Sequence, residues 1–152
     1  MFRIFISTPM SVIASDKYGK FRADILAVIR YIDSRLPSLD IHYSGIEISD
    51  NSHFESSAIS FRRDVAALEK SKLFVLIYPE QSATSALIEL GYALRMKIPV
   101  FIFFPNRSML PYMIKNLDEV LENAHLFEYG NMELLDFFRG DNKIIETFHY
   151  YL

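Results

Sequence analysis

Apolar residues along the chain fall into short continuous runs and into longer segments where they recur every three or four positions. The short runs are rich in β-branched and aromatic residues, which is typical of strands. They lie at residues 2–7, 39–43, 72–78, 100–104 and 126–129. The longer spacing predicts helices. These cover about residues 15–36, 57–70, 84–96, 112–122 and 132–138, and residues 144–152 close the chain.

Strands that alternate with helices favour a parallel sheet with helices on both faces and right-handed crossovers. Continuous apolar runs such as 100–104 are typical of strands covered on both faces. We therefore predict a single domain over residues 1–152. Its expected fold is a three-layer α/β/α sandwich with a mainly parallel, five-stranded sheet of the flavodoxin or Rossmann kind.

Two features of the connections complete this prediction. Ser15 or Asp16 is a candidate cap for the first helix. Residues 44–57 are mostly polar, and a loop this long inside a compact domain is often functional. The helix after that loop is expected to turn Ile59, Val65 and Leu68 toward the core.

Composition narrows the function classes. The net charge of −3 gives no basic surface for a nucleic acid, so none is expected as a partner. The absence of cysteine excludes thiol catalysis, and four scattered histidines predict no metal site. No apolar run reaches the ~18 residues of a membrane span, and the first run is too short for a signal peptide. We expect a cytoplasmic protein without a membrane partner.

Ligands of such sheets bind beyond the carboxyl ends of the strands. Three loops are expected to meet there: Ser7-Thr8-Pro9, residues 79–84 and residues 105–110.

Ser82, Thr84 and Ser85 stand at the start of a predicted helix, a combination that favours an anion such as phosphate. Simple helix capping is the alternative interpretation. Glu89 follows Ser85 by four residues on the same helix face and has apolar neighbours. It is either a solvent-facing carboxylate or one held in a pocket. Asp64, on the preceding helix, is either a surface residue paired with an arginine or part of the site.

The segment from Ser82 to Leu94, with Glu89-Leu-Gly-Tyr-Ala at its centre, resembles the nucleoside 2-deoxyribosyltransferase superfamily. The resemblance extends over residues 1 to about 105 and includes Ile4-Phe-Ile-Ser-Thr-Pro9. It implies that Glu89 is the catalytic nucleophile and Asp64 an active-site aspartate. The loop before Glu89 has serines where transferases acting on free nucleosides carry an aspartate. In that respect the chain looks closer to relatives that hydrolyse nucleoside 5′-monophosphates.

The chain also resembles bacterial Toll/interleukin-1 receptor (TIR) domains through Phe5-Ile6-Ser7, Glu89-Leu90 and Ile98-Pro99-Val100. Such domains cleave NAD, commonly in antiphage defence. This second resemblance implies an alternative function, an NAD hydrolase or cyclase that makes a signalling nucleotide. A third possibility is a sensor that binds a nucleotide without cleaving it. The Gly91-Tyr92-Ala93 continuation favours the deoxyribosyltransferase side.

Both resemblances imply cleavage, by hydrolysis or transfer, of an N-glycosidic bond. Glu89 would attack or stabilise the sugar, and Asp64 would orient the sugar or assist proton transfer. No metal or cofactor is expected, and NAD would enter only as a substrate. The resemblance further implies a homodimer or larger assembly, with residues 44–57 or Asn106 reaching a neighbour. The predicted substrate-binding residues are Ser7, Thr8, Pro9, Ser82, Thr84, Ser85, Tyr92 and Arg62, with Arg63 as an alternative to Arg62.

Overall fold

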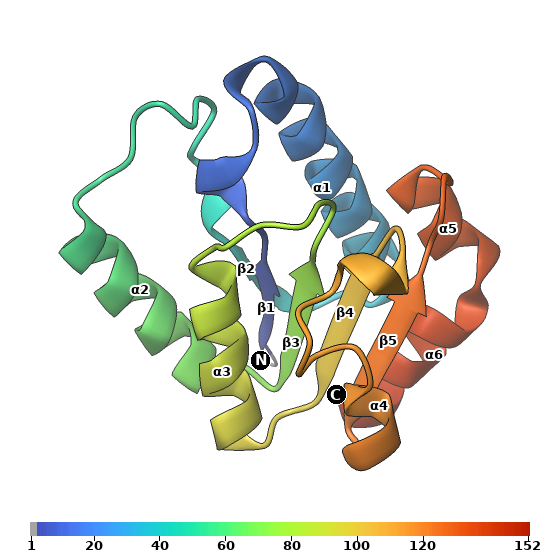
Figure 1. Cartoon of the computed structure of the whole chain (residues 1–152). Coiled ribbons are helices and arrows are strands. Elements are labelled where there is room, and N and C mark those ends of the chain that lie inside the picture. Colours follow the sequence, from blue (N-terminus) through green and yellow to red (C-terminus); the bar gives the residue numbers. More distant parts are fainter. Residues whose placement is uncertain (1–2) are drawn as a thin grey trace.

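The computed structural model, which describes residues 3–152, is a five-stranded sheet between two layers of helices (Figure 1). The strands are β1 (Arg3–Ser7), β2 (Asp40–Tyr43), β3 (Leu73–Ile77), β4 (Val100–Phe104) and β5 (Ala124–Glu128). The helices are α1 (Ser15–Arg35), α2 (Ser57–Glu69), α3 (Ala86–Met96), α4 (Leu117–Val120), α5 (Leu134–Gly140) and α6 (Asn142–Tyr151). The predicted three-layer fold is confirmed. Phe2, which the prediction included in the first strand, lies outside the described residues.

The sheet is parallel throughout, in the order β2-β1-β3-β4-β5. Every residue of the central strands β3 and β4 is buried, which explains why their sequences show no alternation of polar and apolar positions. The chain reverses its direction of travel across the sheet between β1 and β3. In sheets of this order, ligands bind outside the carboxyl ends of the strands at that point.

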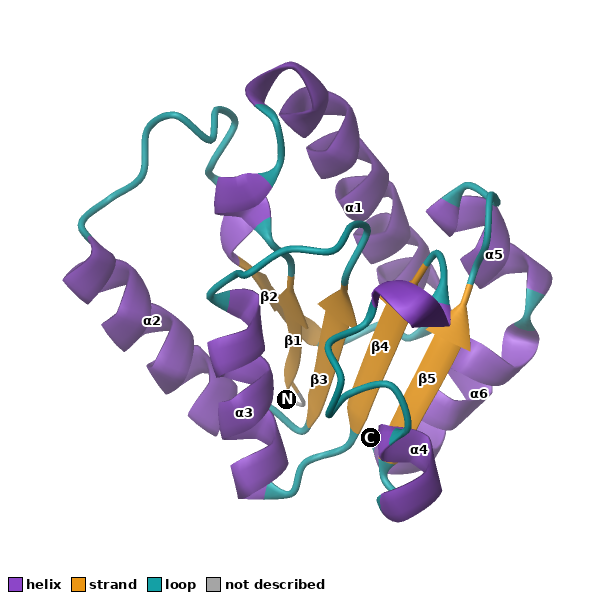
Figure 2. Cartoon of the chain, viewed as in Figure 1, coloured by secondary structure: helices purple, strands orange, loops and turns teal. Residues whose placement is uncertain are grey.

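Helices cover both faces of the sheet (Figure 2), and each face has its own hydrophobic core. Helices α1, α5 and α6 bury apolar side chains against one face, among them Ile25, Phe138 and Phe148. Helices α2 and α3 cover the other face with Leu68 and Leu90, and α4 packs beside β5.

Several predicted elements differ from the structure: the starts of α3, α5 and α6 are each displaced by two residues, and other differences are larger or have a clear cause. The helix expected over 112–122 is reduced to α4, because Tyr112 and Met113 are exposed and offer no apolar stripe to bury. The last strand begins two residues earlier than predicted, at Ala124. Helix α1 begins after Ala14 with no side-chain cap, so the predicted cap at Ser15 or Asp16 is wrong.

Helix α2 is anchored to the sheet only near its carboxyl end, where Ala67 and Leu68 are buried. Ile59, near its other end, is 55% exposed, so its predicted place in the core is wrong. Val65 is half-buried. The amino-terminal half of α2 therefore borders a cavity instead of the sheet.

No helix within residues 3–152 is long and apolar enough to cross a membrane.

Candidate active site

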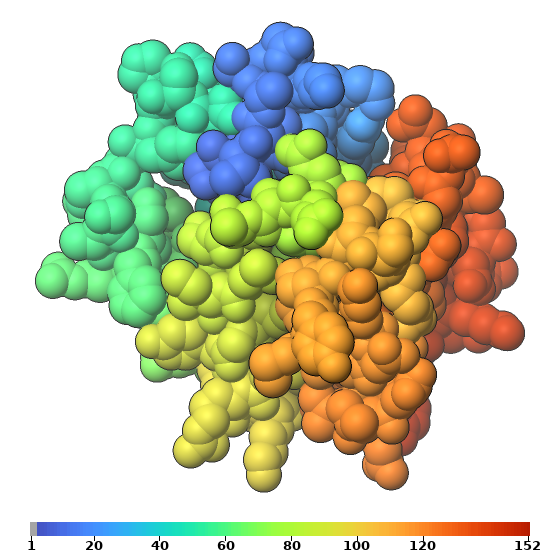
Figure 3. All heavy atoms as spheres, in the orientation of Figure 1, coloured from blue at the N-terminus to red at the C-terminus, as the bar shows by residue number. Residues whose placement is uncertain are grey.

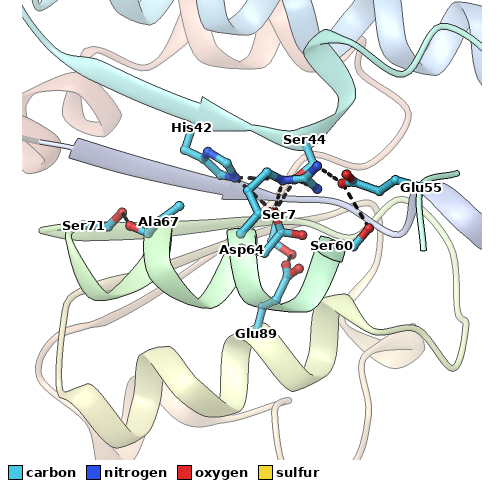
Figure 4. Close-up of polar contacts among 10 residues, drawn as sticks. Ser7, His42, Ser44, Glu55, Ser60, Asp64, Ala67, Ser71 and Glu89 are labelled. Atoms are coloured by element: carbon cyan, nitrogen blue, oxygen red, sulfur yellow. Dashed lines mark hydrogen bonds and ion pairs between the residues drawn. The ribbon is translucent and has the colours of Figure 1, made fainter. Parts of the chain in front are cut away.

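Glu89 rises from the first turn of α3 to the end of β1, where Ser7 Oγ donates a hydrogen bond to Glu89 Oε2 (Figure 4). Ser7 is buried at the carboxyl end of its strand, so its hydroxyl has a fixed position. Burial raises the pKa of Glu89 to about 7, and the nearby charge of Asp64 adds to the rise. The Ser7 hydrogen bond and the charge of Arg63 oppose it. Near neutral pH this carboxyl group therefore exists in both protonation states.

Asp64 approaches from α2, and Figure 4 shows it close to Ser7 and Glu89. Three donors converge on its Oδ1 atom: His42 Nε2 at 3.2 Å, Ser44 Oγ at 2.9 Å and Arg63 Nε at 3.0 Å. Burial alone would raise the pKa of Asp64, but these hydrogen bonds and the charge of Arg63 outweigh it and lower the pKa. The two carboxyl groups of one pocket are thus shifted in opposite directions, a pattern found where two acids have different catalytic roles.

The arginine beside Asp64 is held from its other side by Glu55, which forms an ion pair with Arg63. Glu55 belongs to the loop before α2, so the pair connects that loop to the helix. His42 is fixed in a similar way. Its ring stacks on Phe5, the residue opposite it on β1, with 4.9 Å between ring centroids.

All of these groups except His42 line a cavity of about 590 Å³, which is within the usual range for a small-molecule site. Figure 3 shows a hollow between the connection after β1, the α2 region and the segment leading into α3. The cavity lining is largely apolar and includes Phe5, Ile6, Phe54, Phe61, Leu68, Ile88 and Tyr92. Phe61 and Tyr92 meet edge to face with their ring centroids 6.2 Å apart. Apolar walls with few polar groups suit a flat ligand that carries a polar part.

Two hydroxyl groups of the cavity lining, Thr8 Oγ1 and the Tyr43 hydroxyl, are enclosed without a hydrogen-bond partner among residues 3–152. Burial raises the pKa of Tyr43 to about 12. Gly45 is needed beside it, since a Cβ atom there would overlap the Tyr43 ring. The chain turns here, over Ser44–Ile46, and from this turn Ser44 reaches Asp64.

The long segment between β2 and α2, which was expected to reach a neighbouring subunit, lines the cavity of its own chain. Ser44, Ile48, Phe54 and Glu55 all line it. Asn51 holds the segment in place by donating to the carbonyl oxygens of Met10 and Ile13, at 3.0 and 2.7 Å. Asn106, the other residue expected to reach a neighbour, accepts a hydrogen bond from Ser108 N in its own loop.

Six predicted site residues line the cavity: Glu89, Asp64, Ser7, Thr8, Ser85 and Tyr92. Pro9, Ser82, Thr84 and Arg62 do not.

Two of the predicted phosphate ligands have other hydrogen bonds. The Ser82 backbone pairs with the Tyr78 hydroxyl, and its Oγ donates to Glu80 O. Thr84 Oγ1 accepts from Ala86 N, the first residue of α3, but the residue at the N-cap is Ser85, so the predicted cap at Ser82 or Thr84 is wrong. The loop expected after β4, residues 105–110, also contributes nothing to the cavity, whereas the segment after β2 does.

Residue-type arguments missed His42, Ser44 and Glu55. The printed sequence holds no local signal for the contact between His42 and Asp64, which are 22 residues apart. Only the adjacency of β2 and β1, with α2 lying against them, brings these two side chains together. Of the two arginines predicted as alternatives, Arg63 lines the cavity and donates to Asp64, and Arg62 does not line it.

No protein-family model matches the chain, and no curated protein matches it by sequence. Solved structures do match. One is the CMP N-glycosidase BcmB of Clostridium botulinum, 17% identical with a TM-score of 0.63, over 98% of this chain and 99% of that chain. Another is a conserved protein of Enterococcus faecalis V583, 15% identical with a TM-score of 0.55, over 100% and 99%. At these identities the likeness establishes the fold along the whole chain. Neither protein is described as a TIR domain, so that resemblance gains no support here.

Proposed function

We propose that this protein cleaves the N-glycosidic bond of a nucleotide, with Glu89 as the nucleophile. The observation that carries the proposal is the pair of carboxyl groups in one cavity, Glu89 bound to Ser7 and Asp64 bound to three donors. A carboxylate that can reach the anomeric carbon is the nucleophile of a retaining mechanism, and a second carboxylate in the same cavity can orient the sugar or assist proton transfer. The shared fold with a CMP N-glycosidase supports the same class of reaction.

In this mechanism the Glu89 carboxylate attacks C1′ of the sugar while the bond from C1′ to the base nitrogen breaks. The electron pair of that bond leaves with the base, which takes up a proton. Water then cleaves the ester between C1′ and Glu89 and restores the carboxylate. The overall reaction consumes one nucleotide and one water, and it releases a base and a sugar phosphate. Asp64 orients the sugar or assists proton transfer.

The charges around the cavity bear on the choice between nucleotide and nucleoside. Arg63 faces Glu55 and Asp64, so its charge is already balanced by anions. Of the predicted phosphate ligands, Ser85 lines the cavity and makes no capping bond. A phosphate would therefore bind at Ser85 and the start of α3, one helical turn before Glu89. Substrates with and without a phosphate test this part of the proposal directly.

The assay incubates the protein with a panel of nucleosides, nucleoside 5′-monophosphates and NAD, and separates the products by chromatography. We expect free base from at least one 5′-monophosphate and none with Glu89→Gln. Glu128→Gln, which changes an exposed glutamate at the end of β5, is the matched control. Release of nicotinamide alone would favour the NAD hydrolase, and tight binding without any product would favour the sensor. Size-exclusion chromatography tests the expected homodimer or larger assembly.

A further inference from the structure

The hydrogen bonds of Asp64 are distributed unevenly between its two oxygen atoms. All three donors, from β2, from the turn after it and from α2 itself, reach Oδ1. No hydrogen bond within residues 3–152 reaches Oδ2. Oδ2 is not among the fully enclosed side-chain oxygens that lack a partner in that part of the chain, so it keeps some exposure, and Asp64 is one of the residues that line the cavity. One edge of the carboxylate is fixed and the other is free for a ligand.

The surroundings of Asp64 favour its ionised form. Ser44 and the guanidinium of Arg63 both donate to Oδ1. An ionised carboxylate only accepts hydrogen bonds, so His42 must carry its proton on Nε2. The other charged groups nearby are Glu55, which pairs with Arg63, and Glu89 across the cavity. The lowered pKa of Asp64 agrees with this arrangement. Such a group is a poor source of protons for a leaving base.

The charges that develop on the substrate during the reaction determine which part of it an ionised Asp64 can stabilise. When the bond to the base breaks, positive charge develops on the sugar ring and negative charge on the base. A permanent anion beside the base would oppose its departure, whereas one beside the sugar would stabilise the transition state. The hydroxyl group nearest the anomeric carbon is the 2′-hydroxyl, and hydrogen bonds to that group strengthen in the transition state.

Resting on the proposed function, we infer that Asp64 remains ionised and that its Oδ2 accepts a hydrogen bond from the 2′-hydroxyl of the substrate. The substrates are then ribonucleotides in preference to 2′-deoxyribonucleotides. His42 is a positioning residue, because it acts on the substrate only by holding Asp64. Its own position comes from β2 and from the stacking of its ring on Phe5.

The main experiment measures kcat/KM for base release from a ribonucleoside 5′-monophosphate and from its 2′-deoxy counterpart with the same base. The wild-type protein should prefer the ribonucleotide by about 10- to 100-fold, since the deoxy substrate leaves a carboxylate oxygen unpaired. In Asp64→Asn the preference should fall to about threefold or less. A wild type without preference, or an Asp64→Asn variant that keeps it, would overturn the inference.

A second comparison separates an orienting anion from a proton donor. A substrate with a more acidic base departs without needing a proton. The loss of activity in Asp64→Asn should be the same for this substrate and for the ordinary one. If the better leaving group restores activity, Asp64 is the general acid and the inference is wrong.

The role of His42 is tested with two substitutions. His42→Phe keeps a ring that can stack on Phe5 and removes the donor to Asp64, so it should weaken the preference for the ribonucleotide. His42→Gln restores a donor and should recover part of that preference. Equal preference in both variants and the wild type would contradict the positioning role.

Binding gives a readout that does not depend on turnover. Titration calorimetry with Glu89→Gln should show tighter binding of the ribonucleotide than of the deoxynucleotide. Equal affinities would count against a contact with the 2′-hydroxyl. Wild-type turnover in Glu89→Gln would instead contradict the proposed function, independently of the inference about Asp64.

Discussion

At each edge of the sheet, a histidine ring on the edge strand stacks on a phenylalanine ring of the neighbouring strand, but the surroundings of the two pairs differ. On β2, His42 stacks on Phe5 of β1, and on β5, His125 stacks on Phe101 of β4 with 4.7 Å between centroids. The pairs lie on opposite faces of the sheet, since Phe5 and Phe101 belong to different cores. His42 contacts the carboxylate of Asp64, a residue that lines the cavity, whereas His125 Nε2 lies 3.0 Å from the Tyr151 hydroxyl on α6.

The helix that covers each histidine explains the difference. Helix α6 packs Ile144, Ile145 and Phe148 into the core beneath β4 and β5, and burial lowers the pKa of His125. Helix α2 buries only Ala67 and Leu68 and leaves the rest of its inner side to the cavity. We call β2, α2 and the cavity that they border, with Ser7 and Glu89 in its lining, the open edge, and we call β5 with α6 the filled edge. Substitutions at the open edge should change activity more than stability, and those at the filled edge should do the reverse.

The largest effect is expected for Glu89→Gln at the open edge, with a loss of base release of about a thousandfold or more.

The same variant should be more stable than the wild type at high pH. The folded protein holds the Glu89 proton up to about pH 7, whereas the unfolded chain releases it near the usual 4.5. Wild-type stability therefore falls as pH rises between these values, by roughly 2–3 kcal/mol, and the glutamine variant avoids the loss. Thermal unfolding at pH 5 and pH 8 measures the difference; equal stability at both would contradict it.

A core substitution at the filled edge should show the opposite behaviour. Phe148 is fully buried and meets Phe101 edge to face, with 4.6 Å between centroids. Phe148→Ala should lower the free energy of unfolding by about 3–5 kcal/mol through lost burial and a residual cavity. The kcat/KM of the molecules that remain folded should stay within about threefold of wild type. Urea unfolding and kinetics at 15 °C test both statements, and a loss of activity beyond the unfolded fraction would show that the two edges are coupled.

The adjacent arginines of α2 offer a smaller and more local test. Arg63 donates to Asp64 and pairs with Glu55, whereas Arg62 is exposed and outside the cavity. Arg63→Ala should reduce kcat/KM about 10- to 100-fold, because it frees Asp64 from one of its three donors. Arg62→Ala, the matched control one residue away, should stay within about twofold of wild type. Similar losses in both variants would mean that the cavity charge matters and the contact with Asp64 does not.

The same two arginines show where prediction from the sequence ends. Strand β4 was predicted within its true bounds because a strand covered on both faces is apolar at every position. Neighbouring helix residues point about 100° apart, so choosing Arg63 over Arg62 requires knowing which side of α2 faces the cavity. Glu89 and Asp64 became candidates through resemblance, since spacing alone allowed a solvent-facing interpretation of each. His42 meets Asp64 through strand order, a property of the whole fold that no local pattern contains.

The smallest expected effect concerns the pH dependence of the open edge. Glu89 must be ionised to attack, so kcat/KM should rise with pH and reach its plateau above the Glu89 pKa of about 7. Ser7 lowers that pKa by donating to the carboxylate. Ser7→Ala should therefore move the rise to higher pH by about half a pH unit or more. Its activity should be several-fold below wild type at pH 6.5 and much closer to wild type at pH 9. Tyr151→Phe, which removes the partner of His125 at the filled edge, should leave the profile in place. A Ser7→Ala profile at the wild-type position or at lower pH would mean that Ser7 does not set the charge of Glu89.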